Sequence, residues 1–578
     1  MPGIAGGFNV NSKAMATHLC YRNYTRTDTI SSDIAEFTVA HHEPANNSDW
    51  SEIRGENIMA VVWGQAPPSM NASLINKALH DVSCLKGLDG SWALAAMSGH
   101  KVILATDRMA SRPVYYSDQS PIRVSSEIKG ILSTMKNWSL DISWLMDFLT
   151  FGFGWGNSTI VKEIKSLPPA TAMVADENSY EIRRYADWIF SADAKPQDYV
   201  PELVLRYKDA VEYGLSRLPQ SLSVGFDLSG GLDSRVMASV ARNRINSTFT
   251  YDDNPPSGRN PVIAAEIAKV LDMPNLDVGY GEQDAWAKIL EDAIWATDSM
   301  KEWIHYHGVT TIWASRQQQV DVMISASGQG ELFGEDISEE LLAMSPVAAL
   351  LRRFQNLDPG IVKAIITNKG WSPENSIQSA IESTIGRTDR DRILCGVYDN
   401  FYPNFHFRGK PARAVIEIAN LLINCSLINW IGAMPASLRD NRLLKGRLPG
   451  CYSTLKLEMA CLIDHGIENV PCERSYFPPK SPALLHAISC IFQGLMRRFR
   501  RNKTISKPKA WMCGPGEFQS VIKMGLSSLS AVHEINMDQI WAYWASYQLG
   551  QKDFTPLFSR LSTVGLWLQR ANDKFPSH

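Results

Sequence analysis

S-L-S-V-G-F-D-L-S-G-G-L-D-S-R-V-M-A-S-V, residues 221–240, is the stretch that decides the fold. Apolar residues alternate from Leu222 to Leu228, and this period of two predicts a strand. Gly230 and Gly231 then predict a tight turn, and the apolar residues after Asp233 predict a helix. The chain is therefore expected to run through strand, turn and helix around residue 230, with further elements arranged about that unit.

The turn has the composition of a phosphate-binding loop. Two successive glycines let several backbone N–H groups point into one concavity at a helix N-terminus, where the helix dipole favours an anion. Asp233 would repel a bare phosphate, so its expected partner is a Mg²⁺ ion that bridges phosphate oxygens. The expected ligands are ATP and Mg²⁺; the alternative is an ordinary strand–turn–helix junction. The candidate nucleotide-binding residues are Leu228, Ser229, Gly230, Gly231, Asp233 and Ser234.

The hexapeptide S-G-G-L-D-S at residues 229–234 resembles the pyrophosphate-binding loop of the ATP-pyrophosphatase family. Enzymes of that family split ATP into AMP and pyrophosphate while they activate a carboxylate or carbonyl oxygen. The turn is not a Walker loop, because no G-K-[ST] follows its glycines. The resemblance implies that Asp233 is both a metal ligand and a catalytic residue.

Length and composition indicate a multidomain protein. At 578 residues the chain is long enough for two or more domains. Its net charge of −3 gives no electrostatic reason to expect nucleic acid. The nine cysteines are scattered without a C-x-x-C pair, which favours reduced thiols and a cytoplasmic location. Residues 414–434 are apolar but interrupted by Glu417 and three asparagines, so a buried helix is expected there and no membrane span.

The first 190 residues predict a β-rich domain, because short apolar runs recur with turn signals between them. Three segments resemble the glutaminase domain of asparagine synthetases: L-D-G-S-W-A at residues 88–93, A-T-D-R-M-A-S-R-P-V-Y-Y at 105–116 and S-S-E-I-K at 125–129. The resemblance implies an N-terminal-nucleophile (Ntn) type αββα sandwich over residues 1–190, followed by a synthetase domain over residues 200–578.

The residues that hydrolyse glutamine in that family have no counterpart here. Active members start M-C-G-I and use the cysteine thiol as nucleophile, whereas this chain starts Met1-Pro2-Gly3-Ile4. Proline has no thiol, so a covalent thioester cannot form. The family's R-G-P-D and N-G-E-I-Y-N segments are also replaced, by the sequences at residues 21–28 and 63–67. The N-terminal domain is therefore predicted to be a scaffold.

The second half alternates strand and helix patterns. Strands are expected at residues 247–251, 275–279 and 321–325, and helices at 201–217 and 261–271. Such alternation predicts a parallel sheet with its site at the carboxyl ends of the strands. From about residue 340 the chain is expected to be mostly helical. The fold class is thus α/β with two domains, a sandwich and then a parallel sheet of ATP-pyrophosphatase type with a helical C-terminal part.

A second glycine-rich segment, S-A-S-G-Q-G-E-L-F-G at residues 325–334, resembles the S-G-x-G-x-D-E-L-F-G loop of the same family. The resemblance implies that Gly328 lines the nucleotide site. Gly330 falls where the family carries an aspartate that shares Mg²⁺ with the first loop. Glu331 is the expected substitute, with Glu335 and Asp336 as alternatives, because Mg²⁺ needs only one or two carboxylates besides water and phosphate. Weakened metal binding, with Glu331 only a helix-start carboxylate, stays open.

Family members also carry a late lysine that contacts the acyl-adenylate. Lys480, in Y-F-P-P-K-S-P at residues 476–482, is the candidate catalytic lysine. Lys507 and Lys509 are alternatives, and an ordinary surface lysine is the default interpretation for each of the three. The family's P-F-L-D segment is absent from the corresponding region.

These features predict an ATP-dependent synthetase that adenylates a carboxylate and lets an amine attack it. Without a glutaminase, the amine is expected on the substrate itself, as in the β-lactam synthetases and lasso peptide cyclases that this chain resembles. The favoured substrate is a peptide bearing a carboxylate and an amine that closes a macrolactam, and a peptide-processing protein is a further expected partner. The alternatives are amidation of a small carboxylate with ammonia and a non-catalytic ATP-binding protein.

Overall fold

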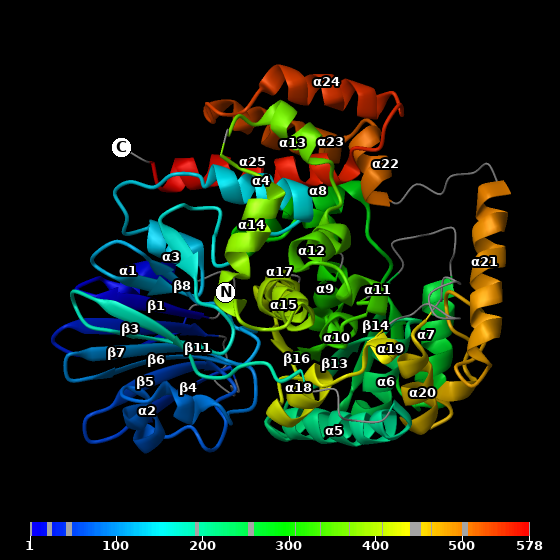
Figure 1. The fold of residues 1–578 in the computed structure, drawn as a ribbon, viewed down its shortest axis with the longest axis horizontal. Coiled ribbons are helices and arrows are strands. Elements are labelled where there is room, and N and C mark those ends of the chain that lie inside the picture. The colour runs from blue at the N-terminus through cyan, green and yellow to red at the C-terminus, as the bar shows by residue number, and fades with distance from the viewer. Residues whose placement is uncertain are drawn as a thin grey trace.

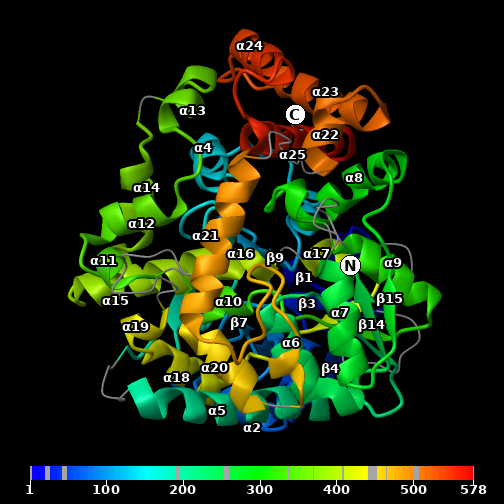
Figure 2. The ribbon, with the colours of Figure 1, turned by 90° about the vertical axis from the view of Figure 1, so that its right-hand side faces the viewer.

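A computed structural model defines the fold (Figures 1 and 2). It describes residues 3–19, 26–41, 49–190, 196–251, 259–306, 308–335, 337–368, 370–406, 409–439, 452–463, 465–499 and 507–576. The N-terminal domain lies on the left of Figure 1, the parallel sheet lies near the centre, and the last helices lie across the top.

Two six-stranded antiparallel sheets form the N-terminal domain. The first has the order β10-β8-β9-β1-β3-β2 and the second the order β12-β11-β7-β6-β5-β4. The strands of the first sheet are β1 (Gly3–Phe8), β2 (Arg26–Ser31), β3 (Ala35–His41), β8 (Tyr115–Ser117), β9 (Arg123–Ser125) and β10 (Ile164–Ser166). Those of the second are β4 (Trp50–Arg54), β5 (Met59–Gly64), β6 (Trp92–Ser98), β7 (Lys101–Thr106), β11 (Thr171–Ala175) and β12 (Tyr180–Arg184).

The two sheets pack face to face and helices cover their outer faces. Along β6, Ala93 and Ala95 point into the core between the sheets, whereas Leu94 and Ala96 point to the outer face, which α2 (Ala72–Ala78) covers. Because both faces of β6 are buried, its sequence is a continuous apolar run. Helices α1 (Ser12–Thr17) and α3 (Ile128–Leu132) cover the other sheet. The predicted αββα sandwich is confirmed.

Five parallel strands form the sheet of the second domain, in the order β15-β14-β13-β16-β17. They are β13 (Val224–Asp227), β14 (Ser247–Thr250), β15 (Asn275–Asp277), β16 (Val322–Ile324) and β17 (Glu417–Ala419). Helices α5 (Pro196–Ser216), α6 (Leu232–Ala241), α7 (Arg259–Val270), α8 (Gln283–Thr297) and α9 (Val309–Gln317) lie between the first four strands or precede them. Strand order reverses at β13, so its carboxyl end is the expected ligand position.

The strands expected at residues 222–228, 247–251, 275–279 and 321–325 are all present, each shorter than predicted. The single buried helix expected over residues 414–434 is wrong. That segment holds the edge strand β17 and then helix α18 (Cys425–Gly432). Glu417 is tolerated in the strand because Arg112 pairs with it, and Asn424 caps α18 by accepting the N–H of Leu427 at 3.0 Å. Both polar residues have structural partners that the apolar pattern could not reveal.

After residue 340 the chain is mostly helical, as expected. The principal elements are α12 (Pro346–Phe354), α15 (Asp389–Cys395), the π-helix η5 (Gly396–Phe401), α20 (Thr454–Ile463), α21 (Ala483–Phe499), α23 (Glu517–Ser528), α24 (Met537–Gln548) and α25 (Thr555–Lys574). Among the described residues, no helix combines the length and apolarity needed to cross a membrane.

The expectation of reduced thiols throughout is wrong for one position, because Cys490 is disulfide-bonded. The free described cysteines are Cys84, Cys395, Cys425, Cys461, Cys472 and Cys513.

Buried polar contacts join the two domains. Arg112 of the sandwich donates to Glu417 of β17 at 2.5 Å, and both side chains are almost fully buried. Lys129 bonds to Asp298 at 3.1 Å, again with both groups buried. The backbone N–H of Gly90 donates to the carbonyl of Ile423 at 2.7 Å. Charges at such positions are costly unless they are paired, so these contacts fix how the domains dock.

We expect Arg112→Met to lower the free energy of unfolding by about 3–5 kcal/mol, because it leaves the carboxylate of Glu417 buried without its main cation. Arg183→Met is the matched control, because Arg183 pairs with Glu181 on an exposed strand. Exposed pairs contribute about 1 kcal/mol or less. Thermal unfolding monitored by circular dichroism should show a much lower midpoint for the Arg112 variant. Equal midpoints for the two variants would contradict a docking role for the buried pair.

Candidate active site

The loop at residues 229–234 joins the carboxyl end of β13 to α6, as predicted. It is closed on itself by the hydroxyls of two serines. The Ser234 hydroxyl accepts the N–H of Ser229 at 3.1 Å and donates to the Ser229 carbonyl at 3.0 Å. The two hydroxyls are 2.8 Å apart. The serines therefore shape the turn, and their oxygens remain beside the concavity that the turn forms.

The two glycines are required for close packing, although neither has a positive φ. A Cβ atom at Gly230 would lie 3.2 Å from the Ile263 side chain, and one at Gly231 would lie 3.2 Å from the Ser229 hydroxyl oxygen. The role of the two glycines is to let the loop lie close to α7 and to its own serine.

The N-terminus of α6 is open toward the loop. Gly231 is the N-cap residue, and no side chain caps the first turn. The first backbone N–H groups of a helix have no partner within the helix, and they carry the positive end of its dipole. The ten-residue helix thus provides donors and a favourable field for an anion at the place where the loop predicts one.

Arg235 holds the loop from behind. Its buried guanidinium donates to the carbonyl of Gly230 at 3.0 Å and to the carbonyls of Val470 and Pro471 at 2.7 and 3.0 Å. Asn260 adds a second restraint, since its side-chain oxygen accepts the N–H of Gly230 at 2.7 Å. The loop is therefore held in place before any ligand binds.

Lys456 of α20 is the centre of an ion cluster at the first turn of α6. Its Nζ lies 2.6 Å from an oxygen of Asp233 and 2.5 Å from an oxygen of Glu335. Gln329 donates to Asp233 at 3.3 Å and is itself held by the Tyr207 hydroxyl at 2.7 Å. Helices α6, α10 (Gln329–Leu332) and α20 lie next to one another in Figures 1 and 2. The cluster joins three segments that are far apart in the sequence.

The charges of this cluster depend on one another. Burial by itself would lower the pKa of Lys456, but the carboxylates of Asp233 and Glu335 outweigh burial, so the pKa is raised and the lysine stays protonated. Burial raises the pKa of Glu335, and the nearby Lys456 only partly opposes that shift. A buried ammonium beside two carboxylates is suited to stabilising negative charge and is a poor proton acceptor.

Gly330 explains how Glu335 reaches the cluster. A Cβ atom at position 330 would lie 2.7 Å from a carboxylate oxygen of Glu335 and 3.1 Å from Nζ of Lys456. The missing side chain leaves the space that the Glu335 carboxylate occupies. An aspartate at position 330, as the resembling family carries, would compete with Glu335 for this space.

Four further candidate residues are Gly328, Glu331, Asp336 and Lys480. Gly328 caps α10 with a φ of +88°, a left-handed conformation that favours glycine. Glu331 lies in the first turn of α10, and no hydrogen bond or ion pair of the described residues joins it to Asp233. Asp336 lies outside the described residues. Lys480 is exposed and donates to Asn469, which is not a residue of the loop.

The alternative lysines also have partners outside the loop. Lys507 lies over the ring of Tyr280, 5.8 Å from its centroid. Lys509 pairs with Asp553 at 2.6 Å. Lys456, which the sequence reasoning missed, is the lysine that meets Asp233. The sequence did contain an indication: a single lysine lies between Leu455 and Leu457 in a mainly apolar helix, T-L-K-L-E-M-A-C-L-I.

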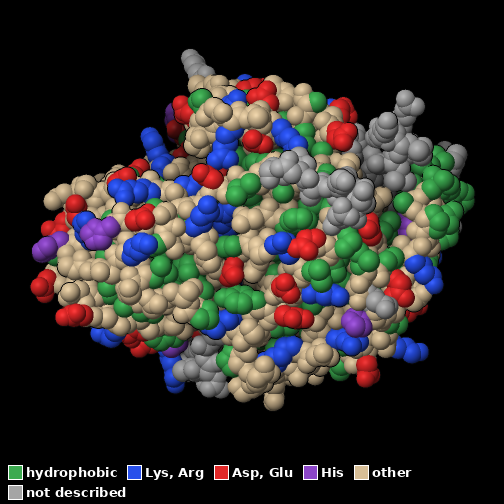
Figure 3. Space-filling view, turned by 60° about the horizontal axis from the view of Figure 1, so that its bottom comes forward, with side chains coloured by type: hydrophobic (Ala, Val, Ile, Leu, Met, Phe, Trp, Pro, Cys, Tyr) green, Lys and Arg blue, Asp and Glu red, His purple; other side chains and the backbone are tan. Residues whose placement is uncertain are grey.

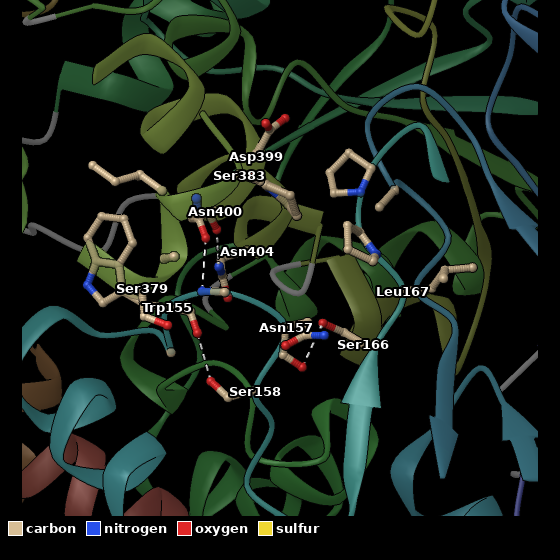
Figure 4. Close-up of a pocket in the computed structure, with 18 of the residues that line it drawn as sticks. Trp155, Asn157, Ser158, Ser166, Leu167, Ser379, Ser383, Asp399, Asn400 and Asn404 are labelled. Carbon is tan, nitrogen blue, oxygen red and sulfur yellow. Dashed lines mark hydrogen bonds between the residues drawn. The ribbon is translucent and has the colours of Figure 1, made fainter. Parts of the chain in front are cut away.

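A separate cavity of about 440 Å³ lies between the domains (Figure 4). The sandwich contributes Trp155 and Asn157, and η5 contributes Asn400, whose side-chain oxygen accepts the Gly156 N–H at 2.9 Å. On the other side of η5, the Tyr398 hydroxyl donates to the Leu332 carbonyl at 3.1 Å. The π-helix therefore separates the cavity from the second loop. Hydroxyl and carboxamide groups dominate its polar lining, among them Asn157, Ser158, Ser166, Ser379, Ser383, Asn400 and Asn404.

Comparison with known protein families gives two separate matches along the chain. Residues 75–186 match the family described as glutamine amidotransferase domain, and residues 208–382 match the family described as asparagine synthase. No curated protein sequence matches the chain.

Two solved structures show a weak likeness. One is the glutamine phosphoribosylpyrophosphate amidotransferase from B. subtilis complexed with ADP and GMP, at 10% identity and a TM-score of 0.22. The other is an allosteric regulatory enzyme of purine biosynthesis, at 11% identity and the same TM-score. In both cases 48% of this chain and 80% of the other chain are covered. Scores this low carry no argument about chemistry.

The asparagine synthase match begins within α5 and includes both loops of the site. A match to a glutamine amidotransferase domain is thus followed by a match to asparagine synthase, which is consistent with an ATP-dependent, amide-forming ligase of an asparagine synthetase-like family.

Proposed function

We propose that the protein adenylates a carboxylate with ATP at the 229–234 loop, releases pyrophosphate, and lets an amine of the substrate displace AMP. The observation that carries this proposal is the meeting of Lys456, Asp233 and Glu335 at the open N-terminus of α6. A helix N-terminus, a pair of carboxylates and a buried cation are the groups that a magnesium nucleotide and a developing negative charge require.

The residues fit ATP and Mg²⁺. The open amides of α6 suit phosphate oxygens, and Ser229, Gly230, Gly231, Ser234, Leu228 and Gly328 line the same turn or the facing loop. Asp233 and Glu335 both bind one cation, Lys456, so two carboxylates already converge at one point. Glu335 therefore fits a metal-ligand role better than Glu331. Bound Mg²⁺ and ATP supply an activated phosphorus and a pyrophosphate leaving group.

This chain's own residues contribute binding and charge. Lys456, protonated because of its two carboxylate neighbours, stabilises negative charge on the reacting oxygens. Arg235 and Asn260 keep the loop in position, so little ordering is needed when the nucleotide binds.

We also propose that the amine comes from the substrate. Pro2 provides no thiol for glutamine hydrolysis. The start of β1 is tightly packed, since a Cβ atom at Gly3 would collide with the Ser126 hydroxyl. A peptide that carries both the carboxylate and the amine, and closes a macrolactam, gains a high effective concentration.

Pyrophosphate release tests the proposal directly. Purified protein with ATP and Mg²⁺ should release pyrophosphate only when a suitable carboxylate is present, and hydroxylamine should trap the activated acyl group. Asp233→Ala should abolish release, whereas Pro2→Ala should leave it nearly unchanged. No ATP binding in calorimetry would instead support a protein without this activity. Equal losses in both variants would contradict the scaffold role of the N-terminal domain.

Lys456→Met should reduce turnover by roughly 10²- to 10³-fold, the size of effect found when a charge-stabilising group is removed. Lys480→Met is the matched control, because that lysine is exposed and bonds to Asn469. Initial rates of AMP formation at saturating ATP would distinguish the two. A loss in the Lys480 variant together with an active Lys456 variant would overturn the assignment.

Glu335→Gln should raise the Mg²⁺ concentration needed for half-maximal activity by about tenfold or more, because it removes one of two converging carboxylates. Glu331→Gln should change that concentration much less, since Glu331 makes no described contact with Asp233. Titration of activity with Mg²⁺ at fixed ATP separates the two carboxylates. The reverse ranking would return the ligand role to Glu331.

A further inference from the structure

Helix α21 (Ala483–Phe499) presents one uncovered apolar face. Large hydrophobic side chains recur along it at spacings of three and four residues and form one stripe. They are Leu484, Leu485, Ile488, Ile491, Phe492, Leu495 and Met496, all exposed, with Phe492 at 61%. In Figure 1 the helix stands at the right-hand edge, and Figure 3 shows hydrophobic side chains along that edge. This apolar stripe needs a partner that shields it from water.

The helix is attached to the protein by its opposite face. His486 and Ala487 are buried, and a ring nitrogen of His486 lies 2.6 Å from the hydroxyl oxygen of Ser475. The stripe is therefore turned outward by specific contacts on the inner face. No charged residue occurs between Lys480 and Arg497, so the stripe itself carries no charge.

The stripe lies within a strongly basic stretch of the sequence. Residues 474–516 contain nine lysines and arginines and no aspartate or glutamate. Since the whole chain has a net charge of −3, the other residues together carry −12. Four of the arginines, at positions 497, 498, 500 and 501, follow the stripe directly. An apolar helix face next to a cluster of cations is the pattern of helices that lie in the surface of an anionic membrane.

We infer that α21 binds an anionic phospholipid surface, with the stripe at the boundary between headgroups and acyl chains, and the positive charge of the surrounding sequence favours the anionic lipid. Lipid is favoured over a protein partner because the stripe offers no hydrogen-bonding side chain, and protein interfaces carry about one hydrogen bond per 100–200 Å². Lipid is favoured over a second copy because symmetric pairing of two α21 faces would bring two such basic stretches together. The inference does not depend on the proposed reaction.

Vesicle binding by the full-length protein tests this inference. With vesicles of phosphatidylcholine containing phosphatidylglycerol, co-sedimentation should give a partition coefficient at least about tenfold higher than with phosphatidylcholine alone, and salt should reduce it. Ile488→Asn with Phe492→Asn should abolish binding. The matched control is Ile385→Asn with Leu549→Asn, two exposed apolar residues outside α21, which should bind normally.

Arg497→Gln with Arg498→Gln should lower binding to anionic vesicles only. Thermal unfolding of each variant shows whether its fold is intact. The inference is overturned if folded protein binds neither kind of vesicle, if the Ile488/Phe492 variant binds as the parent does, or if sedimentation shows a dimer that this variant dissociates while vesicle binding is absent.

Discussion

The arrangement of the candidate site depends on one buried ammonium between two carboxylates. Lys456 bonds to Asp233 of the first loop and to Glu335 after the second loop, and it comes from a helix more than 200 residues beyond the first loop. Without this cation, two partly buried carboxylates would face each other beside the same helix turn, and their repulsion would separate the loops. Without the carboxylates, the ammonium would be buried alone. Each charge is tolerated because the other two are present.

The same reasoning accounts for an N-terminal domain that retains its architecture without a catalytic cysteine. Arg112 and Glu417, and likewise Lys129 and Asp298, are buried pairs with one member in each domain. Removing the sandwich would leave Glu417 at the start of the edge strand β17 and Asp298 at the end of α8 without these partners. Arg560 of α25 adds contacts to the Leu149 carbonyl at 2.8 Å and to Glu302 at 3.2 Å. A domain joined to its neighbour through buried charges is part of that neighbour's structural support.

The local sequence predicted those parts of the fold that depend on short-range patterns of apolar and turn residues. Alternating apolar residues before Ser229 and in the three following strands predicted four of the five parallel strands, and the short motifs predicted the sandwich. The fifth strand was missed because its three residues carry Glu417, whose main partner there is Arg112, 305 residues away. Glu335 was only an alternative to Glu331, because its position depends on space that Gly330 leaves open in three dimensions. Lys456 was missed because the periodicity of a mainly apolar helix does not show which residues a single lysine in that helix will contact.

The ion cluster also bears on how a magnesium nucleotide could enter the proposed site. In the ligand-free arrangement Lys456 offsets part of the negative charge of Asp233 and Glu335, so the turn repels an approaching phosphate less than two bare carboxylates would. Asp233 and Glu335 would hold a divalent cation in place of Lys456, two positive charges would then replace one, and the ammonium would be available to pair with a phosphate. Replacing Lys456 by the metal would break the ion pairs of Lys456, but each charge would again have a partner of opposite sign. In the proposed site, joint binding of metal and nucleotide would be favoured over binding of either alone, because only the pair would satisfy the carboxylates, the ammonium and the open amides of α6 at once.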